Sequence, residues 1–176
     1  DMASVDIDLK ETAKRMAAIG EGGLRSLGAK FLRTIREKLN NGDWKINEPG
    51  QPIWYTTEGL LAMYPIVAKE IIEALRAKGE TSIPVDAPKV LQILTDSGLV
   101  ATFLNSEGST YNVLKFSLQA SRKSGTDVPV SGTAFKFVNE LAVPEYYVMP
   151  TPIPVTIYDP TGVKMGYGGI VEEGTQ

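Results

Sequence analysis

The chain has 176 residues, 43% of them hydrophobic and 22% charged, which is the composition of one globular domain and excludes wholesale disorder. Lys and Arg number 18 against 21 Asp and Glu, a net charge of −3, so any nucleic-acid-binding face has to be local. Cys and His are absent, which excludes a thiolate nucleophile, a disulfide, a Cys/His zinc site and imidazole acid–base catalysis.

The functional groups that remain are carboxylates, amines, phenols and hydroxyls. Asp43, Glu48 and Glu58 could be grouped as magnesium ligands, but their spacing matches no metal-binding pattern. The glycines at positions 20, 22 and 23 are followed by no Lys-Ser or Lys-Thr pair, so they do not make a nucleotide-binding loop. We therefore expect no catalytic residue, no metal and no cofactor, and a chain that is not itself an enzyme.

The sequence also lacks the signals of membrane insertion and secretion. No apolar stretch approaches the roughly 18 to 20 residues of a membrane span, and no charged start followed by an apolar block resembles a secretory signal. We expect a cytoplasmic protein with no membrane partner.

Apolar residues that recur every three or four positions predict three helices. They cover residues 24–39, residues 65–78 and residues 86–97, the last with Asp86 as its N-cap. A weaker helical pattern near the start indicates an N-terminal arm or lead-in helix within residues 1–23.

Short runs with a period of two predict β-structure between and after these helices. Trp44–Ile46 and Ile53–Tyr55 are expected to form a small irregular hairpin that leads into the second helix. Residues 99–104 and 110–118 are expected to form a second hairpin around a Gly-containing turn.

The C-terminal third is less regular. Residues 119–131 are small, polar and interrupted by Gly and Pro, which predicts a loop, and residues 133–138 favour a strand. Three prolines within residues 146–157 indicate an extended edge strand or a polyproline-like strand. Residues 159–176 are expected to form a flexible tail.

Three helices followed by a two-stranded hairpin is the element order of a winged helix-turn-helix domain. We therefore predict an α+β fold: one winged-helix-like domain over residues 24–158, with an inserted small β element and an extended C-terminal β strand.

The first helix carries the strongest basic feature. Residues 24–45 have a net charge of +4 in an otherwise acidic chain. Such a stripe is suited to contact with phosphate groups, or it is an ordinary solvated helix face whose charges pair with carboxylates. Four basic residues flank the apolar face: Arg25, Lys30, Arg33 and Arg36.

A second basic cluster consists of Lys115, Arg122 and Lys123, on the predicted wing and the loop after it. These residues could contact a nucleic-acid backbone, although any exposed loop can carry basic residues. The third helix offers little to read bases, because Lys89 is its single basic residue between Asp86 and Asp96. Any DNA binding should therefore be weak, tolerant of sequence and strongly dependent on salt.

Aromatic residues flank the turn at residues 47–50. Trp44, Trp54 and Tyr55 could stack on unpaired bases or receive a peptide, or they could close the edge of the domain as part of its core.

Residues 31–54 (FLRTIREKLNNGDWKINEPGQPIW), together with GLLAMYP at residues 59–65, resemble the C-terminal domain of TraI-type conjugative relaxases of the MOB-H class. The shared pattern is a helix, an Asn-x-Pro turn with a β run, a Gly-Leu entry to the next helix and a closing proline-rich strand at residues 150–156. The resemblance covers residues 24–158, with Gln51 in place of an expected small residue, and leaves out residues 1–23.

The resemblance implies a winged-helix-like fold and an accessory role in conjugative transfer. The family's metal-dependent catalysis is attributed to a separate His-containing region, so no catalytic residue carries over to this chain. Our hypothesis is a non-catalytic domain that binds DNA through the two basic clusters. The alternative is a protein-interaction domain that docks the relaxase to coupling or auxiliary transfer proteins through Trp54, Tyr55, Pro150 and Pro152.

Overall fold

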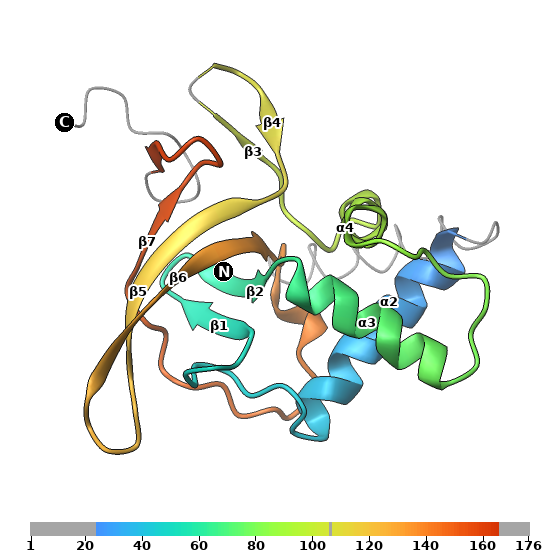
Figure 1. The fold of residues 1–176 in the computed structure, drawn as a ribbon, viewed down its shortest axis with the longest axis horizontal. Coiled ribbons are helices and arrows are strands. Elements are labelled where there is room, and N and C mark those ends of the chain that lie inside the picture. The colour runs from blue at the N-terminus through green and yellow to red at the C-terminus, as the bar shows by residue number, and fades with distance from the viewer. Residues whose placement is uncertain (1–23, 106, 166–176) are drawn as a thin grey trace.

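The computed structural model describes residues 24–105 and 107–165, and the expected N-terminal arm at residues 1–23 lies outside them. Three helices gather beside an antiparallel sheet in this part of the chain (Figure 1). They are α2 (Leu24–Asn40), α3 (Ile66–Ala77) and α4 (Ala87–Asp96). The α+β class predicted from the sequence is confirmed.

Each helix turns a stripe of apolar side chains toward one shared core. In α2, Phe31, Ile35 and Leu39 recur every four residues and are at most 3% exposed. Asp86 caps α4 as expected, because its carboxylate accepts a hydrogen bond from the backbone N–H of Lys89 at 2.9 Å. Apolar spacing therefore located all three helices correctly.

Six strands form one sheet in the order β1-β2-β6-β5-β7-β8, and all the pairings are antiparallel. These strands are β1 (Ile53–Thr56), β2 (Gly59–Met63), β5 (Leu114–Ser121), β6 (Asp127–Lys136), β7 (Val155–Tyr158) and β8 (Lys164–Met165). Beyond them lie a two-stranded ribbon of β3 (Phe103–Leu104) and β4 (Thr110–Tyr111) and a short 3-10 helix, η1 (Glu140–Ala142). Figure 1 shows β5 and β6 as a long, curved hairpin.

The sheet curls back until its first strand meets the segment that precedes β7. Ile153 forms a parallel bridge with Thr56. Its N–H donates to the carbonyl of Tyr55, and its carbonyl accepts from the N–H of Thr57, both at 3.0 Å. This pairing covers the edge of β1 and closes β1, β2, β6, β5 and β7 into a small barrel-like layer.

The sheet has a hydrophobic core on each face, because neighbouring residues of a strand point to opposite sides. Ile53 packs with the helices, whereas Trp54 points into the curled sheet. In the same way, Phe135 packs with the helices and Ala134 belongs to the core inside the curled sheet. The core inside the curled sheet consists of Trp54, Leu61, Phe103, Leu114, Phe116, Leu118, Ala120, Ala134, Ile157 and Met165.

The pairing of the predicted strands is partly wrong. The strand at residues 53–56 pairs with β2, and the run at residues 44–46 contributes a single parallel bridge from Ile46 to Ile53. Residues 99–104 and 110–118 do not form one long hairpin, since β3 pairs only with β4 and β5 pairs with β6 and β7. Periodicity marks a strand, but it does not identify the strand's partner.

The prediction of a loop over residues 119–131 is confirmed only for residues 122–126 and is wrong for the residues on either side. β5 continues to Ser121, β6 begins at Asp127, and a turn at residues 122–126 joins them. Here the side chains on one face are polar and those on the other are small, as at Gln119 and Ala120, so the alternation of hydrophobicity is weak. The strand predicted at residues 133–138 is confirmed as the end of β6.

The hairpin that follows the helices is not a free two-stranded wing. It lies inside the six-stranded sheet, paired on one side with β2 and on the other with β7. The proline-rich stretch precedes β7, which lies between β5 and β8 and is therefore not an edge strand. Residues 159–165, expected to begin a tail, form a turn and then β8.

The side chain of Asn47 holds the segment before β7 against β1 and so helps to close the curled sheet. Its side-chain oxygen accepts from the N–H of Tyr55 at 2.6 Å, and its amide nitrogen donates to the carbonyls of Tyr55 at 3.1 Å and Thr151 at 3.2 Å. Its backbone lies in the left-handed region, with φ of 64°, which asparagine tolerates better than most residues. One side chain therefore joins the 47–50 turn, β1 and the segment before β7.

The Asn47→Ala variant should lose roughly 1–3 kcal/mol of unfolding free energy, because the carbonyl of Thr151 and the N–H of Tyr55 lose their partner and the left-handed backbone becomes strained. The carbonyl of Tyr55 keeps the N–H of Ile153 as a donor. Urea denaturation followed by circular dichroism measures the loss. Asn47→Asp keeps the acceptor and should retain part of the stability. Asn40→Ala, at an exposed position that ends α2, is the matched control and should stay within about 0.5 kcal/mol of the wild type. An equal effect at both positions would contradict this role for Asn47.

Candidate functional site

The basic stripe on α2 is interleaved with acidic partners. Lys30 forms an ion pair with Glu80 at 2.8 Å, and both side chains are about one-third exposed. Arg33 is exposed and Arg36 is half-buried. Arg25 lies on α2, but its side chain is not among those described. For Lys30, the interpretation as a paired, solvated helix face therefore fits the geometry better than contact with phosphate.

Arg122 and Lys123 lie at the tip of the β5–β6 hairpin, and both are exposed. The N–H of Arg122 donates to the carbonyl of Thr126 at 2.9 Å, and its carbonyl accepts from the N–H of Gly125 at 2.8 Å. Gly125 has a φ of 87°, a left-handed conformation that suits glycine. The turn therefore presents two adjacent cations on a hydrogen-bonded scaffold.

The hairpin tip faces the turn that contains the Asn-x-Pro sequence. An open hollow of about 450 Å³ lies between Arg122 and Lys123 on one side and Glu48, Pro49 and Gly50 on the other. Two segments that are more than 70 residues apart in the sequence thus form one concave surface, with two cations and one carboxylate.

The predicted basic residues do not form one site. Lys115 is exposed on β5, seven residues before Arg122, which is roughly 20 Å along an extended strand. The helix α2 packs against α3, α4 and η1. Figure 1 shows the hairpin tip on the opposite side of the molecule from α3 and α4. The structure therefore separates a helical patch from a hairpin patch.

The aromatic residues are mainly structural. Trp54 is 1% exposed, and its indole N–H donates to the carbonyl of Gln51 at 3.0 Å, so the core interpretation is confirmed and Trp54 cannot contact a partner in this conformation. Tyr55 is half-buried, and its hydroxyl donates to Glu140 at 2.9 Å. This hydrogen bond, with burial and the charge of Glu140, raises the pKa of Tyr55.

The proline-rich segment is only partly open. Pro150 is half-buried, whereas Pro152 is exposed. Of the four residues predicted for protein docking, Pro152 is exposed, Tyr55 and Pro150 are half-buried, and Trp54 is buried.

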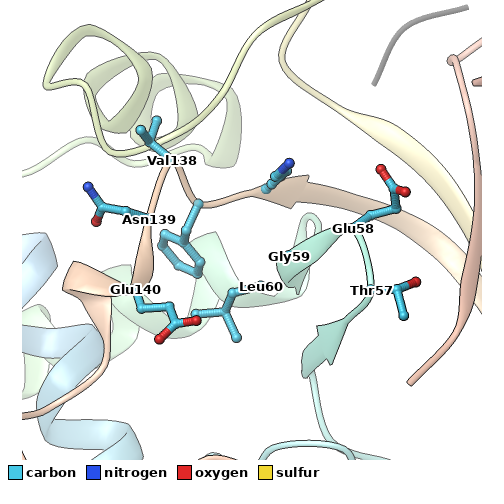
Figure 2. Close-up of a pocket in the computed structure, with 9 residues that line it drawn as sticks. Thr57, Glu58, Gly59, Leu60, Val138, Asn139 and Glu140 are labelled. Atoms are coloured by element: carbon cyan, nitrogen blue, oxygen red, sulfur yellow. The ribbon is translucent and has the colours of Figure 1, made fainter. Parts of the chain in front are cut away.

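A second hollow, of about 330 Å³, lies between the β1–β2 turn and the segment that follows β6 (Figure 2). Thr57 to Leu60 form one wall, and Lys136 to Glu140 form the other. Figure 2 shows the side chains of Glu58 and Glu140 on different sides of this hollow, so the two carboxylates do not converge as a general acid–base pair would. In residues 24–105 and 107–165, no three acidic side chains are grouped so that they could hold a metal ion.

Strand register brings together two residues that the sequence did not single out, the half-buried Tyr158 and the exposed Lys164. Tyr158 on β7 lies opposite Lys115 on β5, and Lys164 on β8 lies opposite Tyr158. The sequence places Tyr158 at the end of the domain and Lys164 in a tail, and no local pattern connects either of them with residue 115. Their juxtaposition results entirely from tertiary pairing of the strands.

Asp159 fixes the turn between β7 and β8. Its carboxylate accepts from the N–H and hydroxyl of Thr161 at 2.9 and 2.6 Å and from the N–H of Val163 at 3.0 Å. Burial acts to raise the pKa of Asp159, but these hydrogen bonds, together with one from the backbone of Gly162, outweigh it and hold the pKa below its usual value. The turn thereby positions Lys164 beside Tyr158.

The family model TraI_2, described as "Putative helicase", matches residues 1–111 of the chain. Among solved structures, the chain is similar to the C-terminal domain of the Salmonella enterica protein STY4665, with a TM-score of 0.45 and 14% sequence identity, over 75% of this chain and 96% of that one. No curated protein matches the chain. None of the helices in the described residues combines the length and the hydrophobicity needed to cross a membrane.

The turn at Asp159 should make stability depend on pH. Because the folded-state pKa lies below the unfolded value of about 3.9, the carboxylate stabilises the fold above about pH 4, and this contribution is lost as the pH falls through the folded-state pKa. Asp159→Asn should cost roughly 1–3 kcal/mol at pH 7, and its difference from the wild type should shrink as the pH falls below about 4 and through the folded-state pKa.

Urea denaturation at a series of pH values measures this dependence. Thr161→Val, which removes the hydroxyl donor at 2.6 Å, should reduce the pH dependence in part, and Thr161→Ser should leave it intact. The same pH dependence in Asp159→Asn and in the wild type would show that this carboxylate does not contribute.

Proposed function

The chain belongs to the TraI_2 family, and on that basis we propose that it is a non-catalytic accessory domain in conjugative DNA transfer that binds DNA through its phosphate backbone. The membership agrees with the resemblance to TraI-type proteins in residues 31–65, although the family match begins at residue 1, within the segment that the resemblance left out.

The tip of the β5–β6 hairpin carries this proposal. Arg122 and Lys123 are adjacent, exposed and held by the hydrogen bonds of the turn. Cations on a rigid protruding hairpin can reach phosphates without losing much side-chain and backbone freedom on binding. Arg33 on α2 and Lys115 on β5 are exposed as well, but they lie away from the hairpin tip and are not part of this site.

A winged-helix-like arrangement is part of the proposal. The order of α2, α3, α4 and the β5–β6 hairpin supports it, since three helices precede the hairpin, which here is part of the six-stranded sheet. In such an arrangement α4 would face the DNA, but its exposed surface has Lys89 between Asp86 and Asp96. One cation and two carboxylates favour contact with the backbone over base reading.

The residue types present support the non-catalytic part of this proposal. The sequence has no His, no Cys and no glycine-rich loop followed by Lys-Ser or Lys-Thr. The hollow in Figure 2 does not bring its two carboxylates together. We assign binding, and no step of strand cleavage or nucleotide hydrolysis, to this chain.

Protein docking remains the second candidate, and one observation favours it. Tyr146 and Val148 are 92% and 89% exposed, next to the proline-rich segment. Large apolar side chains that are exposed in this way are typical of contact residues at protein interfaces. The surface would then include Tyr146, Val148 and Pro152, and it would not include Trp54.

Fluorescence anisotropy with labelled DNA between about 50 and 200 mM salt tests the proposal. Arg122→Glu/Lys123→Glu should weaken binding at least tenfold at the lowest salt and make the slope of log K against log salt shallower by about 2, because two phosphate contacts are lost. Lys69→Glu/Arg76→Glu makes the same charge change at exposed positions on α3 and should have a much smaller effect.

The same anisotropy titration is carried out with the triple variant Arg25→Glu/Arg33→Glu/Arg36→Glu, which reverses three charges on α2. Circular dichroism checks that this variant is folded. If this variant alone loses DNA binding, the DNA-binding site is on α2 and not on the hairpin. No binding at low salt to single- or double-stranded DNA would overturn the DNA proposal, and pull-downs with conjugation proteins would then test the docking alternative.

A further inference from the structure

The outer face of the sheet carries a row of cationic and aromatic side chains. Lys115, Tyr158 and Lys164 occupy directly opposed positions on β5, β7 and β8, and opposed residues of antiparallel strands point to the same face. Thr133 on β6 extends the row beside Lys115. The inward neighbours Phe116 and Ile157 are at most 2% exposed, so this face lies on strands that are anchored in the core of the curled sheet.

The two lysines are exposed and Tyr158 is half-buried between them. Neighbouring strands are about 4.8 Å apart, so the backbones of Lys115 and Lys164 are separated by roughly 10 Å, with the tyrosine in the middle. The next row is formed by Ser131, Ser117 and Thr156, and neither row contains an acidic residue.

The ring of Tyr158 lies across the sheet instead of standing upright. Its hydroxyl is 3.3 Å from the hydroxyl of Ser117, which is two residues along β5 from the directly opposed Lys115. A tyrosine can reach this diagonal position only by leaning over the strand surface, and the side chain of Tyr158 stays partly exposed there.

The face is hollowed next to this tyrosine. A depression of about 570 Å³ begins at Ser117 and Thr156 and continues past Pro129 and Pro154. Its lining is made of hydroxyls, one amide, prolines and the edges of valines and a leucine, with no charge of either sign. Such a surface accepts a flat, partly polar group.

We propose that this face binds single-stranded DNA, with one unpaired base stacked on Tyr158 and phosphates of the same strand held by Lys115 and Lys164. The proposal rests on the proposed function in one respect, that the ligand is DNA, but it places an additional site on a different face. Stacking platforms flanked by cations bind single strands without reading their sequence, because every base has a flat face. A duplex covers its base faces everywhere except at its ends, so this site distinguishes single from double strands.

Anisotropy with a labelled oligothymidylate and with a duplex of equal length tests the site in the full 176-residue chain. Tyr158→Ala should weaken binding of the single strand by roughly tenfold or more and change binding of the duplex by less than about twofold. Tyr158→Phe keeps the ring, loses the contact to Ser117 and should stay within about twofold of the wild type. Tyr146→Ala removes a tyrosine that is 92% exposed outside the row and is the matched control.

If circular dichroism shows that Tyr158→Ala is unfolded, Lys115→Gln/Lys164→Gln replaces it, since both positions are exposed. This variant should make the salt slope for the single strand shallower by about 1.4, which corresponds to two phosphate contacts on a single strand.

The outcomes separate the two proposals. If Tyr158→Ala binds the single strand like the wild type while Arg122→Glu/Lys123→Glu loses DNA, the hairpin site stands and this one is wrong. An equal loss for the single strand and the duplex contradicts stacking on Tyr158. If the wild type binds neither probe, both proposals fall together.

Discussion

The hydrogen bonds of the Asn47 side chain are the constraint on which the arrangement of the sheet depends. They fix the segment before β7 against β1, and the backbone bonds of Ile153 then continue that contact. The position of this segment sets where β7 meets β5, and hence which residues lie opposite one another on the outer face. The Asn-x-Pro turn is therefore a local sequence feature whose effect is long-range: it determines the closure of the sheet.

The curled sheet gives the molecule two cores that share the same strands. Side chains such as Ile53 and Phe135 complete the helical core, and their neighbours Trp54 and Ala134 fill the inside of the sheet. A strand that is packed on both faces has little freedom to tilt or slide. The strands β5 and β7 continue beyond the helices, so their outer face is both rigid and open, a combination that suits binding.

The sequence predicts those parts of the fold that are determined locally. A spacing of three to four residues located the helices, and the chemistry of Asp86 located a helix start, because both signals lie within a few residues of the element that they describe. The partner of a strand is determined by contacts between residues that are distant in the sequence. Local patterns therefore could not predict β2, the continuation of β5 past residue 118 or the pairing of β8. The same limit applies to the candidate sites: the exposure of Arg122 and Lys123 was correctly expected, whereas the burial of Trp54 and the position of Tyr158 beside Lys115 depend on tertiary structure.

The pairing of β2 with β6 also bears on how far the folding unit of this chain extends. The family match ends at residue 111, before β5 and β6 begin. Yet Phe135 and Phe137, which pack edge to face with ring centroids 5.3 Å apart, belong to the helical core that is otherwise built from the matched segment. A polypeptide that ended at residue 111 would leave that core incomplete and the edge of β2 unpaired, and an unpaired edge readily recruits strands from other molecules. In this chain the helical core and the sheet therefore depend on strands that lie well past the segment by which the family is recognised.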